Sequence, residues 1–403
     1  MTDIFIYNPT GEMAIANGMV SYMPPKNLRH FESDLAFLPS FFASKGDIIL
    51  TPNLPNPAFL EQWYALGLVK IRYLSSLKQT NSNLNYIRPW SWNPAIHHKT
   101  KHLKANTSDD FKTSPNFSWK DSSMAFFSRD TTNKVQKYIH ESDVINPIIN
   151  IPSPAISLTS LEDFNSWMSK QKTAILKMPW SSSGRGIHVI APHKNLHANY
   201  PWIKGAIKQQ GFLTAEPLLD KVFDFSFQLE IKQDGEIDFL GISYFINDEK
   251  GHFVGGNINW PHQINEISNF LQVDLLKNVS LILIEALKTV SPHDYYEGPI
   301  GVDAILYKDI KGNLKIHPCV DINWRYNMGI VNISLPKFVD ENAIGFWKVS
   351  SFRKGEWNKF IESNKKTKPL ITSAFNKISS GFINMTPANE QAAFGVWMEV
   401  WPK

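Results

Sequence analysis

The chain has 403 residues, of which 43% are hydrophobic and 19% are charged, and its formal net charge is only +4. This composition is typical of a globular protein with two or three domains and excludes a disordered chain, while so small a charge gives no reason to expect nucleic acid or a membrane as partner. No apolar run reaches about 18 residues, the sequence begins without a signal-like segment, and a single cysteine, Cys319, excludes an internal disulfide framework, so we expect a cytoplasmic protein.

Residues 1–124 are predicted to form one α/β domain. Strand signals at 4–7, 47–50 and 69–73 alternate with a helix at 57–66, which Gly67 ends. Strands that alternate with helices favour an open, mostly parallel sheet. Residues 76–125 are polar and rich in turn pairs, so two interpretations stay open: a loop-rich connector, or the last strand and helix of this domain.

Residues 125–215 and 216–335 are predicted to form two further units, and 336–403 a C-terminal extension packed on the core. In chain order we expect helices at 131–141 and 162–170, strands at 173–178 and 187–190 around a polar loop, a helix at 197–210 and a strand at 212–219. A hairpin of 223–232 and 237–246 follows, then a long loop at 247–263, a helix at 273–290, and a second hairpin of 300–306 and 314–323.

The second hairpin places two carboxylates and a carboxamide on one face. A turn centred on Gly312 pairs Asp303 with Asp321, and strand alternation puts Asn323 on the same face as Asp321. Opposed side chains lie about 5 Å apart, where like charges repel, so we expect a cation between them. Two carboxylates and an amide oxygen are ligands that suit Mg²⁺; the alternative is a pair of solvated acids. Arg325 is expected on the same side, either stabilising a developing negative charge or in a salt bridge to Asp321 or Asp303.

Upstream, Lys177 lies on the polar face of its strand and a Ser/Gly loop follows it. The loop residues are Ser181, Ser182, Ser183, Gly184, Arg185 and Gly186. Their amides, hydroxyls and guanidinium suit phosphate oxygens, although a flexible surface turn has the same composition, and the strand that follows excludes a Walker-type loop. Glu216 and Asp224 come next, either as partners for an adenine amino group and ribose hydroxyls or as plain acidic strand ends.

The order of these pieces resembles the ATP-grasp superfamily over residues 125–332. The segment 321–329 is similar to the family's Glu-x-Asn-x-Arg metal strand, with Asp321 in place of the Glu, a side chain shorter by one methylene. The first domain resembles, more loosely, the Rossmann-like pre-ATP-grasp α/β domain. The resemblance therefore implies a fold that is α/β and α+β, with an ATP-grasp unit behind an N-terminal α/β domain.

The resemblance also implies roles for the matching residues. Lys177 and Arg129 would contact the phosphates of ATP, with Lys134 and Lys137 as alternatives to Arg129. Residues 181–186 would close over the triphosphate as a lid. The remaining roles are adenine binding by Glu216 and the backbone near Leu218, ribose binding by Asp224, coordination of Mg²⁺ or Mn²⁺ by Asp303, Asp321 and Asn323, and stabilisation of the transition state by Arg325.

The implied activity is that of a ligase, in which ATP phosphorylates a substrate carboxylate and an amine attacks the acyl phosphate to form an amide-type bond. The substrates would be a small-molecule carboxylate and amine, such as amino acids or peptides, and a homodimer stays open. Candidate substrate-pocket residues are His252, Asn257, Asn259 and Arg29. Two alternatives remain, a kinase on the same fold and a nucleotide-binding module without turnover.

Overall fold

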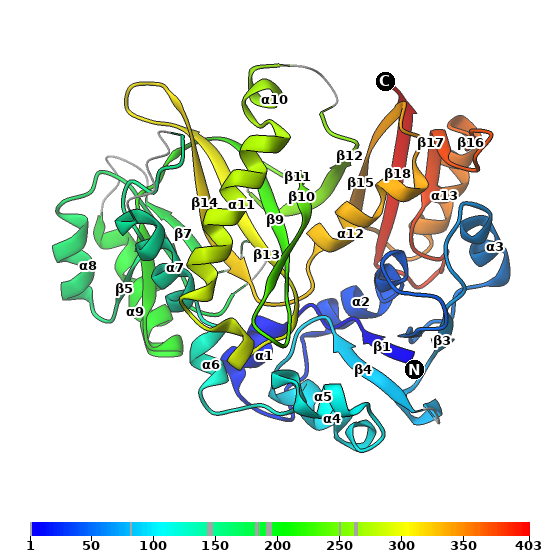
Figure 1. Cartoon of the computed structure of the whole chain (residues 1–403), viewed down its shortest axis with the longest axis horizontal. Helices are drawn as coiled ribbons and strands as arrows, with labels where there is room; N and C mark the ends of the chain where they lie inside the picture. Colours follow the sequence, from blue (N-terminus) through cyan, green and yellow to red (C-terminus); the bar gives the residue numbers. More distant parts are fainter. Residues whose placement is uncertain are drawn as a thin grey trace.

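The structure is a computed structural model that describes residues 2–80, 83–142, 148–181, 184, 186–190, 196–249, 251–261 and 265–403. Within these ranges the strands form four sheets. In Figure 1 the N-terminal sheet lies below the central sheet, a small sheet lies at its left, and the C-terminal sheet, which contains the last strand, lies at its right. The four sheets surround the region where the candidate residues gather.

The N-terminal sheet is fully parallel, in the order β3-β2-β1-β4. Its strands are β1 (Thr2–Ile6), β2 (Ile48–Leu50), β3 (Arg72–Leu74) and β4 (Leu84–Pro89). The helices of this region are α1 (Gly11–Asn17), α2 (Lys26–Asp34), α3 (Pro57–Ala65), α4 (Pro94–Lys104), α5 (Asp109–Thr113) and α6 (Ser123–Phe126). The prediction of a parallel sheet is confirmed. For residues 76–125 the second interpretation is right, because β4 completes the sheet and the Asn93 side chain, which accepts from the Ile96 N–H at 3.0 Å, begins α4.

The central sheet, in the order β10-β9-β13-β14, carries the hairpin that holds Asp303 and Asp321. Its strands are β9 (Asp220–Ile231), β10 (Ile237–Ser243), β13 (Gly298–Lys308) and β14 (Leu314–Asn323). Apolar residues of one face, such as Phe227 and Val302, are buried in one core with Val279 and Leu283 of α11 (Val273–Lys288). Helix α7 (Arg129–Glu141) lies against β14 and α11. Side chains of the other face are therefore free to line a cavity.

The predicted opposition of the two carboxylates is confirmed, but the prediction of a turn centred on Gly312 is wrong, because next to the turn Lys308 pairs with Leu314. Asp303 pairs with Asp321, and Gly312 takes the positive φ of 82° that the turn requires. The pairing shifts between Asp303 and Ile305, where Ile305 pairs with His317. This bulge leaves Asp321 and His317 both beside the cavity that β13 lines.

The small sheet, in the order β5-β8-β6-β7, is antiparallel and has its own apolar core with two helices. Its elements are β5 (Ile156–Leu158), α8 (Leu161–Met168), β6 (Ala174–Lys177), β7 (Ile187–Ile190), α9 (Tyr200–Gln210) and β8 (Leu213–Glu216). Lys177 pairs with Ile187 across β6 and β7, so the predicted strand–loop–strand arrangement is confirmed.

The C-terminal sheet has six strands in the order β11-β12-β15-β18-β17-β16. Its strands are β11 (Phe245–Asn247), β12 (Phe253–Ile258), β15 (Ala343–Ser351), β16 (Ile371–Thr372), β17 (Ile378–Asn384) and β18 (Phe394–Pro402). The nearby helices are α10 (Glu266–Phe270), α12 (Met328–Ser334) and α13 (Glu356–Thr367). One sheet thus holds strands from both sides of residue 335, and the four-part domain division stays a prediction.

The prediction of a long loop at 247–263 is wrong, because β12 lies within it. Two glycines hid this strand, since glycine is depleted in strands. A Cβ atom on Gly255 would lie 1.9 Å from the backbone oxygen of Trp347, so β12 packs against β15 so closely that only glycine fits.

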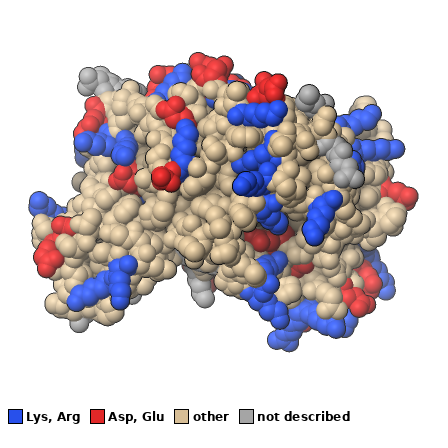
Figure 2. Space-filling view, turned by 90° about the horizontal axis from the view of Figure 1, so that it is seen from below, with Lys and Arg blue, Asp and Glu red and all other residues tan. Residues whose placement is uncertain are grey.

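The surface agrees with the small net charge. On the face shown in Figure 2, basic and acidic side chains both occur, and a broad neutral area lies between them. In the ranges that the structure describes, no helix combines the length and the apolar character that crossing a membrane requires.

Candidate active site

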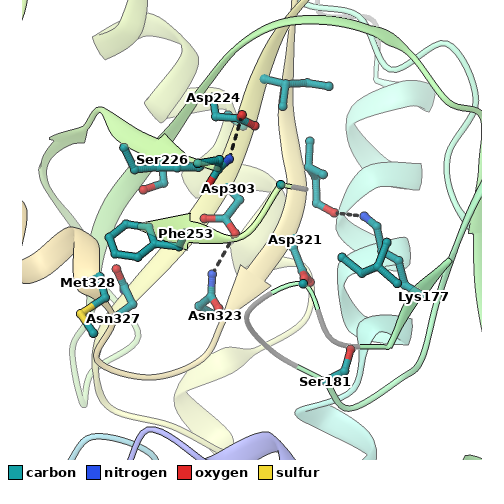
Figure 3. Close-up of a pocket in the computed structure, with 18 of the residues that line it drawn as sticks. Lys177, Ser181, Asp224, Ser226, Phe253, Asp303, Asp321, Asn323, Asn327 and Met328 are labelled. Carbon is teal, nitrogen blue, oxygen red and sulfur yellow. Dashed lines mark hydrogen bonds between the residues drawn. The ribbon is translucent and has the colours of Figure 1, made fainter. Parts of the chain in front are cut away.

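A single cavity of about 690 Å³ brings the predicted residues together. This volume is within the range of about 300–1,000 Å³ that small-molecule sites occupy. Its walls come from the central, small and C-terminal sheets, and from the segment between β1 and α2. Figure 3 shows Asp303 and Asn323 in the middle, Lys177 and Ser181 on one side, and Phe253, Met328 and Asn327 on the other. The cavity therefore has two ends, separated by the carboxylates.

A row of polar side chains crosses the central sheet at this midpoint. Strand pairing aligns Ser243, Ser226, Asp303 and Asp321, one residue from each strand, and all four line the cavity. Asn323 belongs to the next row on the same face, and its amide donates to Asp303 Oδ2 at 3.2 Å. The sheet thus presents two carboxylates and an amide together, as the sequence predicts for a metal site.

The two opposed carboxylates differ in charge balance. Burial and the nearby charge of Asp321 raise the pKa of Asp303 to about 7. Burial acts on Asp321 too, but the charges of Arg129 and Lys177, together with hydrogen bonds from Arg129 and the Ile322 N–H, hold the pKa of that carboxyl below its usual value. In the described part of the chain no three His, Cys, Asp or Glu side chains gather as a metal cluster. The donor set fits Mg²⁺, since that ion commonly takes one or two carboxylates and leaves its other positions to water and phosphate oxygens.

Arg129, at the beginning of α7, is the cation beside Asp321. Its Nη2 lies 2.6 Å from Asp321 Oδ2, and its Nη1 donates to Ser181 Oγ at 2.6 Å. Lys134 and Lys137 instead form exposed ion pairs with neighbouring acids of α7 and do not line the cavity. Of the three cations weighed from the sequence, the structure therefore brings Arg129 to the site.

Lys177 and Glu216 form an ion pair that the sequence did not indicate. Lys177 Nζ lies 2.5 Å from Glu216 Oε1 and also donates to the Val320 carbonyl at 3.0 Å. Both side chains are almost fully buried, and Leu218 lines the wall next to them. Lys177 therefore links the small sheet to β14, and the adenine role of Glu216 and Leu218 stays a prediction.

Asp224 lies one row from Asp303, paired with Ile305. Its Oδ2 accepts from Lys221 at 2.7 Å and from the Asn247 amide at 2.9 Å. Asp224 lines the cavity, so a ribose contact is compatible with its position and stays a prediction.

The Ser/Gly loop is described only in part. Ser182, Ser183 and Arg185 lie outside the described residues. Ser181 and Gly184 line the cavity, whereas Gly186 lies behind Ser181, where a Cβ atom would approach the Ser181 Cβ to 2.8 Å. A Cβ atom on Gly184 would lie 2.8 Å from the His252 ring. The loop thus reaches toward the segment between β11 and β12, and its lid role stays a prediction.

Arg325 lines the cavity, but its ion-pair partner is neither Asp303 nor Asp321. Its Nε contacts Glu12 of α1, and its Nη2 donates to Asn323 Oδ1 at 3.0 Å. As the alternative role of Arg325, the sequence predicted a salt bridge to Asp321 or Asp303, and the structure shows one to Glu12 instead. Sequence reasoning missed Glu12 because no local pattern relates it to a residue some 300 positions away. Glu12 holds Arg325 next to the Asn323 amide.

Several lining residues carry no signal in the sequence. They come from distant segments and include Thr10, Asn27, Phe31, Asn327, Met328, Ser226, Ser243 and Phe394. Of these, only Ser226 and Ser243 follow a pattern, because alternation along the first hairpin aligns them with Asp303 once the sheet order is known. The four residues expected for the substrate pocket are not among the lining residues; Asn259, for instance, donates to the Asp340 and Ala343 carbonyls.

A scan against protein-family models and a search of curated protein sequences return no match. Solved structures match over 100% of this chain. The biotin carboxylase domain dimer of 2-oxoglutarate carboxylase from Hydrogenobacter thermophilus, in complex with MgADP, ADP and bicarbonate, matches with a TM-score of 0.52, 11% identity and 86% of its own chain covered. N5-carboxyaminoimidazole synthetase from Staphylococcus aureus gives 0.51, 11% and 93%, and a biotin carboxylase complex with β,γ-ATP from Campylobacter jejuni gives 0.51, 12% and 87%.

At such identities the likeness establishes architecture rather than activity. The predicted combination of a Rossmann-like N-terminal α/β domain with an α+β unit is confirmed, and this chain has the ATP-grasp fold.

Proposed function

We propose that this protein is an ATP- and Mg²⁺-dependent ligase that joins a carboxylate to an amine through an acyl phosphate. The observation that carries the proposal is the opposed pair Asp303 and Asp321 at the midpoint of one cavity, with Asn323 beside them. The neighbour from Hydrogenobacter thermophilus, which shares this fold, is a complex with MgADP and bicarbonate, and that supports a nucleotide and a small carboxylate-like substrate here.

The role that we propose for each residue follows from its place in the cavity. Asp303, Asp321 and Asn323 would hold Mg²⁺, which when bound neutralises phosphate oxygens of the nucleotide. Lys177 and Arg129 supply positive charge on the nucleotide side, where their present partners are carboxylates. Catalysis would rest on positioning and electrostatics.

Arg325 has a different role because Glu12 fixes it from outside the central sheet. Its guanidinium lies beside Asn323, next to the carboxylates. There it would stabilise the negative charge that develops when the substrate carboxylate attacks the γ-phosphorus and ADP leaves. It would act again when the amine adds to the acyl phosphate, loses a proton, and phosphate leaves.

The proposal is tested by ADP formation with Mg²⁺, ATP and a panel of amino acids and short peptides. Asp321→Asn is expected to lower Mg²⁺-dependent ADP formation roughly 100-fold or more, whereas Asp238→Asn, an exposed change on β10 outside the cavity, leaves it unchanged. Full activity of Asp321→Asn contradicts the metal assignment. Mass spectrometry of the products distinguishes an amide, expected here, from a stable phosphorylated product, which would indicate a kinase.

A further inference from the structure

The cavity continues beyond the carboxylates into an apolar end that the nucleotide does not need. We call this the acceptor compartment, lined by Met13, Leu28, Phe31, Phe253, Met328 and Phe394. These side chains come from α1, α2, α12 and the C-terminal sheet. Figure 3 shows Phe253 and Met328 on the opposite side of Asp303 from Lys177. Three separate parts of the fold thus meet in one apolar wall. The rings of Phe31 and Phe394 pack edge to face there, with their centroids 5.1 Å apart.

The cations of the cavity wall already have carboxylate partners. Among the described lining residues, the four Lys and Arg side chains each pair with a carboxylate: Lys177 with Glu216, Arg129 with Asp321, Lys221 with Asp224 and Arg325 with Glu12. Of these, Arg325 pairs with Glu12, which directly precedes the compartment residue Met13 in α1. The compartment therefore has one neighbouring cation within the described ranges, Arg325, and Glu12 already pairs with it.

The polar groups of the compartment are neutral. Ser243 is fully buried, lines the cavity, and its Oγ has no hydrogen-bond partner in the described part of the chain. It is aligned with Ser226 and Asp303 in the row that leads away from Asp321. This hydroxyl carries no charge, so the row on this side of Asp303 offers no ion-pair partner to a charged side chain.

We propose that the acceptor compartment binds an amino acid with a bulky apolar side chain, whose carboxylate is the group activated beside Asp303 and Arg325. This deepens the proposed ligase and rests on it. The side chain would lie among Phe31, Phe253 and Met328. Burial of a leucine- or phenylalanine-sized group favours binding roughly ten- to hundredfold over glycine. A phosphorylated acceptor is disfavoured, because its charge would enter an apolar wall whose cation is already paired.

Calorimetric titration of the full-length protein saturated with MgADP tests the preference. The probes are L-leucine, L-phenylalanine and L-methionine, against glycine, L-aspartate and O-phospho-L-serine. The apolar probes are expected to bind at least about tenfold more tightly than the others. Absence of binding by all three apolar probes, or tighter binding of O-phospho-L-serine, overturns the inference.

Variants localise the effect. Met328→Glu is expected to weaken leucine binding at least about tenfold, while Met19→Glu, on an exposed methionine outside the cavity, does not. Met13→Glu is a second variant of the wall, should Met328→Glu not fold. Unchanged leucine affinity in the folded variants contradicts the placement. MgADP binding, measured in the same samples, distinguishes failure of the proposed ligase from failure of the acceptor compartment. Absence of MgADP binding in the unmodified protein refutes the ligase. MgADP binding without a preference for apolar amino acids refutes only the acceptor compartment.

Discussion

Replacing Asp303 by Asn is expected to stabilise the metal-free protein at alkaline pH while removing Mg²⁺-dependent turnover. The side chain is buried beside Asp321, and its pKa rises from the ordinary value of 3.8 to about 7. Because the folded state holds this proton more tightly than the unfolded state, the penalty for ionisation is absent below pH 4 and complete above pH 7. Stability of the unmodified protein should therefore fall as pH rises through that window. Asn keeps the oxygen that accepts from Asn323 and carries no charge.

The magnitude follows from the shift. A rise from 3.8 to about 7, at about 1.36 kcal/mol for each pKa unit, corresponds to about 4 kcal/mol. Asp303 also lines the cavity, where water screens part of the charge. We therefore expect Asp303→Asn to raise the free energy of unfolding by about 2–4 kcal/mol at pH 8 and by little at pH 4.

Urea denaturation of both proteins in EDTA, at several pH values between 4 and 8, measures this difference. Asp238→Asn serves as the matched control, since it removes an exposed carboxylate from the same sheet. Added Mg²⁺ with ADP should reverse the order, because a ligand that binds only the folded unmodified protein stabilises it by mass action. A stability gain that does not grow with pH would refute the electrostatic reasoning.

Two further substitutions test the surroundings of the site. Lys177→Met leaves the buried Glu216 without its partner and should lower the free energy of unfolding by roughly 3–5 kcal/mol. In urea denaturation, the double variant with Glu216→Leu should recover most of this lost stability. It should not recover MgATP binding. Gly255→Ala should destabilise by several kcal/mol, as a Cβ atom there meets the Trp347 oxygen at 1.9 Å, whereas Gly205→Ala, with open space around it in α9, should stabilise by about 0.5–1 kcal/mol. Equal thermal melting of the two glycine variants would contradict this description of β12.

The parts of the site that the sequence predicted are those with local causes. The hairpin with its turn next to Gly312, and the alternation that places Asp321 and Asn323 on one face, are both readable within about 20 residues. The position of Lys177 next to the Ser/Gly loop likewise depends only on two neighbouring strands, β6 and β7, and the loop that joins them. The opposition of Asp303 and Asp321 also needs the bulge near His317, because the register next to the turn, Lys308 with Leu314, would otherwise place Asp303 opposite Cys319.

The parts that the sequence did not predict depend on long-range packing. Glu12 reaches Arg325 only because α1 lies against the central unit, and Phe31 meets Phe394 because the end of α2 packs on β18, where Asp34 accepts from the Ala393 and Phe394 amides. No spacing in the chain relates these segments. The strand β12 was missed for the opposite reason, since its glycines suggest a loop until the neighbouring backbone of β15 is known.

The ion pairs give the two carboxylates of the midpoint different relations to a metal. Asp321 already has Arg129 at 2.6 Å, whereas Asp303, within the described residues, has only the neutral amide of Asn323 as a direct partner. A cation that binds here therefore gains more electrostatic free energy from Asp303, whose charge has no cationic partner in the described part of the chain, than from Asp321, whose charge Arg129 already balances. Arg129 also holds Ser181 of the loop through the same guanidinium, so a metal that competes for Asp321 would weaken the anchor between α7 and that loop. One arginine thereby contacts both a proposed metal ligand and the first residue of the Ser/Gly loop.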